Sequence, residues 1–332
     1  MSARAALLID AGPPLCYPTS RGRPAAICNL IVDRSDRLQT ISLIPAQTVS
    51  HADRAQLINR SYADYYVPMH LTAEQMASMD RFYDIDLARS LVALAGHAAV
   101  GIGLLSIRGR CGWITGVGVT PEQRRRGVGR ALIGRLIENA AAAGLRELSL
   151  EVITQNTPAW RLYAEAGFAP VRELLIWRRS AESDALPIPV ERLVPTDAGA
   201  LLANFDRWHS QPVTWQRAAP TLAHMAAAGR LKGYRLDWHG AAAAYCLVSG
   251  HGDTLSLMDV GIDPATDIVT PGRILLQALS HLHWGQAMTI SNVPEDDSLN
   301  RVLAALRFLV TVRQVEMQFD LGGLTGRTES VA

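Results

Sequence analysis

A loop rich in arginine and glycine lies between a predicted strand and a predicted helix, and its residues suit phosphate binding. The loop covers residues 121–129 and contains Gly127 and Gly129. Glycine lets backbone amides approach phosphate oxygens closely, and a helix start offers unpaired N–H groups and the positive end of the peptide dipole. Further positive charge comes from Arg124, Arg125, Arg126 and Arg130. A plain loop with solvated arginines is the alternative, because glycine pairs precede many helices.

Hydrophobic periodicity defines the elements on both sides of this loop. Residues 113–120 alternate as a strand that Pro121 ends, and apolar residues recur at helical spacing from Val128 until Gly144. On this pattern, one face of the strand carries Trp113, Thr115, Val117 and Val119. The strand and the helix would therefore hold the loop at one end of a sheet.

Two linked motifs resemble the GNAT family of N-acetyltransferases. The first is Arg124-x-x-Gly127-x-Gly129 after a strand, which is similar to the acyl-CoA pyrophosphate loop of that family. The second runs from Leu150 to Phe168, and its spacing is closest to that of ribosomal-protein alanine acetyltransferases. The resemblance covers about residues 40–180. It implies acetyl-CoA as the acetyl donor and no metal.

The resemblance also implies where acetyl-CoA binds. In GNAT folds two parallel strands part, and their free backbone groups hold the pantetheine arm, so Val117 and Val119 should offer main-chain contacts to the arm and to the acetyl carbonyl. Asn156 either contacts the arm or only caps a helix. The expected cofactor-binding residues are Val117, Gly118, Val119, Arg124, Arg125, Arg126, Gly127, Val128, Gly129, Arg130 and Asn156.

Two residues match catalytic positions of the family. Tyr163 matches the proton donor to the departing thiolate, because a phenol of pKa about 10 can protonate a thiolate of pKa about 8.5 when the two are in contact. Glu151 matches the glutamate that resembles a base in the ribosomal-protein branch, although a strand glutamate is more often part of a solvated face. Glu122 and Asp64 are weaker candidates for the base.

A tyrosine-rich segment is the candidate acceptor wall. Tyr65 and Tyr66 are expected to bind substrate, since the corresponding segment of the family commonly borders the acceptor. The alternative is that these rings are buried and only their hydroxyls meet water. The acceptor would be an amine on a small molecule, a protein N-terminus or a lysine. A non-catalytic acyl-CoA sensor, in which Tyr163 is structural, is the second hypothesis.

The second half of the chain repeats the first. Residues 260–264 echo residues 117–121, and Gly272-Arg273 falls where Gly129-Arg130 did. The predicted fold is α/β (α+β): two tandem GNAT-like domains, each a mixed sheet with helices on both faces. They are residues 38–180, here called the first copy, and residues 191–322, the second copy, joined by a linker at 181–190.

The second copy is expected to have lost the chemistry of the first. Arg124 is matched by Asp267, and Tyr163 by Leu303. An added carboxylate repels phosphate, so this copy should bind CoA poorly. Its aromatic and histidine residues are interpreted as packing residues, with acceptor recognition as a minor alternative; they include Trp208, His209, Trp215, Trp238 and His239.

Composition limits the remaining possibilities. With 332 residues, 48% of them hydrophobic, the chain can form two ordinary cores. A net charge of +1 and only a short basic cluster argue against a nucleic-acid partner. Four separated cysteines and no long apolar run favour a cytoplasmic protein without a membrane segment. Residues 1–37 and 323–332 are expected to be a poorly ordered extension and a tail.

Overall fold

The computed structural model describes residues 40–67, 69–181, 193–209 and 211–322. The predicted N-terminal extension, the C-terminal tail and all but the first residue of the predicted linker lie outside these ranges. Within the described part of the chain, no helix is long and apolar enough to cross a membrane.

The elements of the first copy follow the hydrophobic pattern closely. Its residues form β1 (Ile41–Pro45), α1 (His51–Ser61), α2 (Ala73–Phe82), β2 (Leu91–Ala95), β3 (Ala98–Arg108), β4 (Cys111–Val119), α3 (Val128–Ala142), β5 (Glu147–Ile153), α4 (Thr157–Ala166) and β6 (Ala169–Arg179). Ser50 caps α1, and Thr72 and Gln75 form a capping box at α2. The strand predicted at residues 113–120 and the helix predicted from Val128 are therefore confirmed, with ends shifted by one or two residues.

The second copy repeats the order of long elements. Its residues form β7 (Leu193–Thr196), α5 (Ala198–Leu201), α6 (Phe205–Trp208), the 3-10 helix η4 (Trp215–Arg217), α7 (Ala219–Ala227), β8 (Lys232–Trp238), β9 (Ala241–His251), β10 (Thr254–Ile262), α8 (Val269–Leu282), β11 (Ala287–Pro294), α9 (Leu299–Ala305) and β12 (Leu309–Asp320). Both copies carry the same irregularity, since Thr115 of β4 and Met258 of β10 are each left out of the ladder to the preceding strand. A shared bulge supports the duplication.

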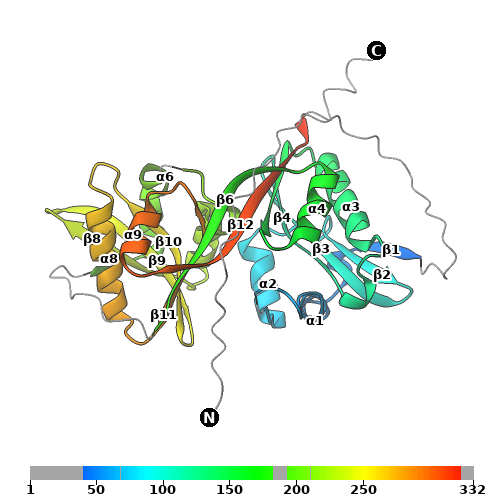
Figure 1. Ribbon diagram of the computed structural model, residues 1–332, viewed down its shortest axis with the longest axis horizontal. Coiled ribbons are helices and arrows are strands. Elements are labelled where there is room, and N and C mark those ends of the chain that lie inside the picture. The colour runs from blue at the N-terminus through cyan, green and yellow to red at the C-terminus, as the bar shows by residue number, and fades with distance from the viewer. Residues whose placement is uncertain (1–39, 68, 182–192, 210, 323–332) are drawn as a thin grey trace, which may run out of the picture. The chain divides into compact units, whose positions relative to one another are not determined.

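The last strands of the two copies have changed places. The described strands form one sheet in the order β1-β2-β3-β4-β5-β12-β6-β11-β10-β9-β8-β7. The final strand of the second copy, β12, pairs antiparallel with β5, while β6 of the first copy pairs with β11. In Figure 1, β6 and β12 run side by side, as their own antiparallel ladder requires. Each copy is thus completed by a strand from the other.

Helices cover both faces of the sheet in each copy. In the first, α3 and α4 cover one face with a core centred on Leu132, Leu136 and Leu148, and α1 and α2 cover the other with Leu57 and Met76. The exchanged β12 contributes Val315 and Met317 to the first of these cores. The packing of the first copy therefore depends on residues near the end of the chain.

The bulge overturns one prediction about β4. Without it, Trp113, Thr115, Val117 and Val119 would share a face. Because Thr115 is an extra residue in the strand, the alternation is shifted there: Val117 and Val119 pack toward α3, whereas Trp113 contacts Tyr83 beyond α2. A bulge cannot be read from alternation alone, which is why the sequence pattern failed at this point.

The exchange predicts that a core mutation in β12 weakens the first copy. Met317 is fully buried, and Met317→Ala should cost about 2–4 kcal/mol of unfolding free energy because it leaves a cavity. Urea unfolding would give this value, and native-state hydrogen exchange should show lost amide protection in β5. The exposed neighbour Gln318, changed to Ala, is the control and should be nearly neutral. Protection lost in the second copy alone would contradict the exchange.

Candidate functional site

The two parallel strands at the centre of the first copy part after three residue pairs. Strands β4 and β5 are paired only from Cys111–Glu147 to Trp113–Ser149. Beyond that point β4 is paired to β3 alone, and Thr120 N donates to Val100 O. Since successive strand residues direct their N–H and C=O groups to opposite sides, Val119 and Val117 direct theirs into the gap toward β5. The expected opening between the strands is present in the structure.

The carbonyls at this open edge already have partners. Val117 O accepts from the Tyr62 hydroxyl at 3.1 Å, and Val119 O accepts from Arg124 Nε at 3.1 Å. Tyr62 can reach β4 because Gly116 and Gly118 carry no side chain: a Cβ on Gly118 would lie 2.7 Å from the Ser61 Cβ. The N–H groups of Val117 and Val119 are the ones left to meet a ligand in the gap.

Helix α3 starts at the end of β4 without a capping side chain. Its N-cap is Gly127, whose φ of +83° is the left-handed conformation that glycine adopts without strain. No atom lies within 4 Å of where a Cβ of Gly127 would stand. The first N–H groups of α3 are therefore open to an anion, with the helix dipole in its favour.

The four arginines of the loop differ in what they contact. Both terminal nitrogens of Arg124 bind the Asp64 carboxylate at 2.6 Å, and Arg130 pairs with Glu165. The Asp64 contact lowers the pKa of that carboxyl. Arg125 and Arg126 are exposed beside the helix start. Positive charge next to a bound anion would come mainly from Arg125 and Arg126. Asp64 is held in its ion pair with Arg124.

A tyrosine-rich stretch, residues 62–66, crosses the gap between β4 and the start of α4. The Tyr65 ring meets those of Tyr62 and Tyr66 edge to face, and the Tyr66 hydroxyl donates to Gln155 O at 3.0 Å. Tyr66 is 54% exposed. These rings border the gap from the side of α1.

Tyr163 lies on the buried face of α4, next to the same group of phenols. Asn156 caps this helix by accepting from Ala159 N at 3.2 Å, so the capping interpretation of Asn156 is confirmed, and its contact with a cofactor stays a prediction. Burial raises the pKa of Tyr163 well above its usual value, and the nearby Tyr62 and Tyr65 add to the effect. The Tyr163 hydroxyl thus keeps its proton at every physiological pH.

Glu151 on β5 is a half-buried carboxyl with two fixed donors. Trp113 Nε1 donates to its Oε2 at 2.8 Å, and Gln216 Nε2 of η4 donates to the same oxygen at 3.3 Å. Burial raises the pKa of Glu151 to about 7, the Glu316 carboxylate adds to the rise, and the two hydrogen bonds and Arg172 oppose it. A carboxyl with a pKa near 7 is suited to accept a proton at neutral pH.

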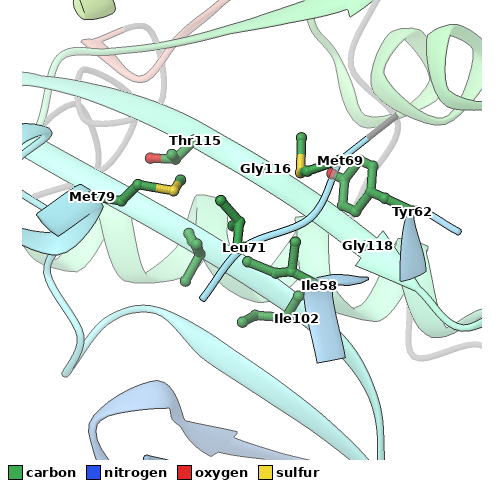
Figure 2. A pocket seen from close by; sticks show the side chains of 10 residues that line it. Ile58, Tyr62, Met69, Leu71, Met79, Ile102, Thr115, Gly116 and Gly118 are labelled. Atoms are coloured by element: carbon green, nitrogen blue, oxygen red, sulfur yellow. The ribbon is translucent and has the colours of Figure 1, made fainter. Parts of the chain in front are cut away.

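An apolar pocket lies against β4 at the bulge. Figure 2 shows Met69, Leu71 and Met79 gathered around it above the strand, with Tyr62 at one side. Its cavity volume is about 50 Å³, and Thr115 and Gly116 form its floor. A space of this size and polarity suits a small apolar group.

The corresponding places in the second copy are filled by its own side chains. At the start of α8, Asp267 accepts from Val269 N at 3.2 Å and from Thr270 Oγ1 at 2.7 Å, so a carboxylate occupies the helix start. At the bulge, the Tyr245 ring fills the space beside Gly261, which has the place of Gly118. The Tyr245 hydroxyl donates to the buried Asp259 at 2.8 Å.

Asp259 is the centre of a buried ionic cluster. Arg217 donates to Asp259 Oδ1 at 3.2 Å, and His209 Nε2 lies 3.0 Å from the same oxygen. The other ring nitrogen, Nδ1, lies 2.9 Å from Phe205 O. Because both ring nitrogens meet acceptors, His209 is an imidazolium. Burial opposes this charge, but Asp259 and the Phe205 carbonyl outweigh burial and raise the pKa of His209. His209 is therefore more than the packing residue that the sequence suggested.

Comparison with known proteins agrees with this geometry. Residues 57–168 match the model of the acetyltransferase (GNAT) family. A GCN5-related N-acetyltransferase from Sphaerobacter thermophilus has 15% identity and a TM-score of 0.64, over 85% of this chain and 96% of that one. A tandem GNAT protein from the clavulanic acid biosynthesis pathway has 18% identity and a TM-score of 0.64, over 85% and 99%. No curated protein sequence matches the chain.

This is the GNAT fold, in a tandem arrangement. A third structure, Eis1 from Mycobacterium abscessus, has 18% identity and a TM-score of 0.51, over 86% of this chain and 75% of that one. The GNAT family match lies within the first copy.

Trp113 and Gln216, the two donors to Glu151, were not singled out as functional in the sequence. Trp113 was interpreted as a strand residue, and Tyr62 was noted only as part of the tyrosine-rich segment. Gln216 lies in the second copy and reaches Glu151 only because that copy packs against the first. Long-range contacts of this kind leave no spacing pattern to recognise.

The His209 cluster predicts a pH dependence of stability. A raised pKa means that the imidazolium stabilises the fold fully below its unfolded pKa, and that this contribution is lost as pH rises through the folded pKa. Urea midpoints measured from pH 5 to pH 9 should fall with pH, and they should fall less in His209→Gln. An unchanged slope in this variant would show that His209 is not charged in the native protein.

Proposed function

We propose that the protein is an N-acetyltransferase that moves the acetyl group of acetyl-CoA directly to an amine, and that the first copy carries the reaction. The observation that carries this proposal is the open edge of β4, with an uncapped helix start beyond its end, Glu151 on the part of β5 that has separated from β4, and Tyr163 buried on α4. The family match of residues 57–168 supports acyl transfer in general.

The residues present fit acetyl-CoA. The N–H groups at the start of α3, with Arg125 and Arg126 near them, suit its phosphates, and the free N–H groups of Val117 and Val119 suit an extended amide-containing arm. When bound, acetyl-CoA supplies the acetyl group as an activated thioester. An N–H of β4 directed at the thioester carbonyl would stabilise the charge that develops on its oxygen.

Glu151 and Tyr163 would move the protons. An amine acceptor arrives mainly as ammonium and needs to lose a proton before it can attack, and Glu151, with a pKa of about 7, would take that proton directly or through a water molecule. Trp113 and Gln216 both bind Oε2 of Glu151, which leaves Oε1 to receive the proton. Tyr163 would give its proton to the departing thiolate; burial raises the pKa of this phenol and so opposes the transfer, which direct contact with the thiolate would favour.

The acceptor is proposed to be an amine beside a small apolar group, because the pocket at the β4 bulge is lined by Ile58, Met69 and Leu71. Tyr65 and Tyr66 would border it. The affinity with ribosomal-protein alanine acetyltransferases stays a prediction. We propose the second copy as the degenerate one, since Asp267 accepts from the first N–H of its own helix and Leu303 replaces Tyr163.

Removing the Tyr163 hydroxyl should separate catalysis from binding. Thiol release from acetyl-CoA would be measured across pools of amines, amino acids, polyamines, aminoglycosides and N-terminal peptides. Tyr163→Phe should lower kcat by about 10²–10⁴ while the affinity for acetyl-CoA is kept. Glu151→Gln should abolish the rise of rate through pH 7. Tight acetyl-CoA binding without turnover in any pool would favour the sensor hypothesis, and unchanged kcat in Tyr163→Phe would exclude this tyrosine as the acid.

A charge at the start of α3 should weaken binding of acetyl-CoA. Gly129→Glu places a carboxylate where phosphates are proposed to bind, so calorimetry should show a loss of at least about tenfold in affinity. Gly134→Glu, five residues further along α3 in open space, adds the same charge and is the charge control. Because a Cβ on Gly129 would lie 3.2 Å from Leu162 Cδ2, circular dichroism would verify that both variants are folded. The same titrations should count one acetyl-CoA per chain. Two equivalents, or equal losses in both variants, would contradict the proposed site.

A further inference from the structure

Glu151 belongs to the first copy, but several of the groups around it come from the second. The 3-10 helix η4 packs against the first copy at this point: the Trp215 ring stacks on Trp113 with ring centroids 6.0 Å apart, and the Arg108 guanidinium lies 4.3 Å from the centroid of Trp215. Trp215 Nε1 also donates to Tyr83 O at 2.9 Å. Gln216, the next residue along η4, is thereby held beside Glu151.

A chain of three amides fixes the direction of the Gln216 side chain. Gln314 Nε2 donates to Asn292 Oδ1 at 2.7 Å, and Asn292 Nδ2 donates to Gln216 Oε1 at 3.3 Å. With its carbonyl engaged, Gln216 presents its NH₂ group to Glu151. An ionised carboxylate only accepts hydrogen bonds, so the polarity of the whole chain matches a charged Glu151. All three amides belong to the second copy.

A second influence acts through the exchanged strand. Glu316 of β12 lies directly opposite Glu151 in the ladder, and Arg172 of β6 lies opposite Glu316 in the next ladder. Glu316 is buried and forms an ion pair with Arg172. Two carboxylates side by side on neighbouring strands disfavour each other's charge, and Arg172 offsets only part of this repulsion. The row Glu151, Glu316 and Arg172 exists only because β12 separates β5 from β6.

We propose that the second copy holds and tunes the base of the first, with Gln216 as the donor that orients the Glu151 carboxylate and Glu316 as the neighbour that favours its protonated form. The inference rests on the proposed function in naming Glu151 the base. It gives the second copy a role in catalysis that does not require it to bind acetyl-CoA. The other groups around Glu151 are Trp113, Arg172 and Tyr83, and none of these residues is substituted in the variants below.

The two residues should act on Glu151 in opposite directions. In the full-length protein labelled with ¹³C at glutamate side chains, NMR would follow the carboxyl of Glu151, assigned by its loss in Glu151→Gln. Glu316→Gln removes a like charge and frees Arg172, so the midpoint should fall from about 7 by roughly one pH unit. Gln216→Leu removes a donor to the ionised form, so the midpoint should rise. In each variant, the pH at which kcat/KM rises should shift in the same direction as the titration midpoint of Glu151.

The control is Gln211→Leu, a surface amide of the second copy that contacts Asp296 and should leave the midpoint and the profile unchanged. Midpoints that stay in place in both Glu316→Gln and Gln216→Leu, or that move in the same direction, would overturn the proposal. Full activity of Glu151→Gln, together with the predicted midpoint shifts, would instead refute the role of Glu151 as base and leave the positioning by the second copy intact.

Discussion

The pairing of β12 with β5 is the interaction on which the rest of the structure depends. A strand that parts from its neighbour on one side, as β5 does from β4, needs a complete ladder on its other side to stay flat and fixed. That ladder runs from Gln314 to Asp320 along the whole of β5. The opening between β4 and β5, which the proposed chemistry requires, is thus supported by a strand from the other half of the chain.

Local periodicity predicted the first copy well, because strands and helices there are set by the side chains that face each core. Asn156 was predicted as a cap from its position, whereas the caps Ser50 and Thr72 were found only in the structure. The faces of β4 were assigned wrongly because a single extra residue, Thr115, shifts the alternation. The strand exchange could not be predicted. The sequences of β6 and β12 do not indicate whether each strand pairs within its own copy or with the other copy.

Sequence patterns predicted the proposed site residues that lie in one short stretch. They did not predict the residues that distant segments bring to the same place. Glu151 and Tyr163 came from one linked motif. The side chains that set the pKa of Glu151 come from residues 113, 172, 216 and 316, and no spacing joins them. The two copies have the same backbone fold but different charges at two equivalent places. Asp267 occupies the helix start of the second copy, and Asp259 lies at its bulge in a cluster with His209 and Arg217.

The position of β12 near the end of the sequence also bears on the order of events during synthesis. A domain made of continuous chain can fold while the ribosome is still adding the next one. Here β5 gains its neighbour only when residues 314–320 have left the exit tunnel, so the first copy cannot reach its native packing before the second copy has been made. Translation that stops after the first copy would leave β5 without this ladder and the core around Leu148 without Val315 and Met317.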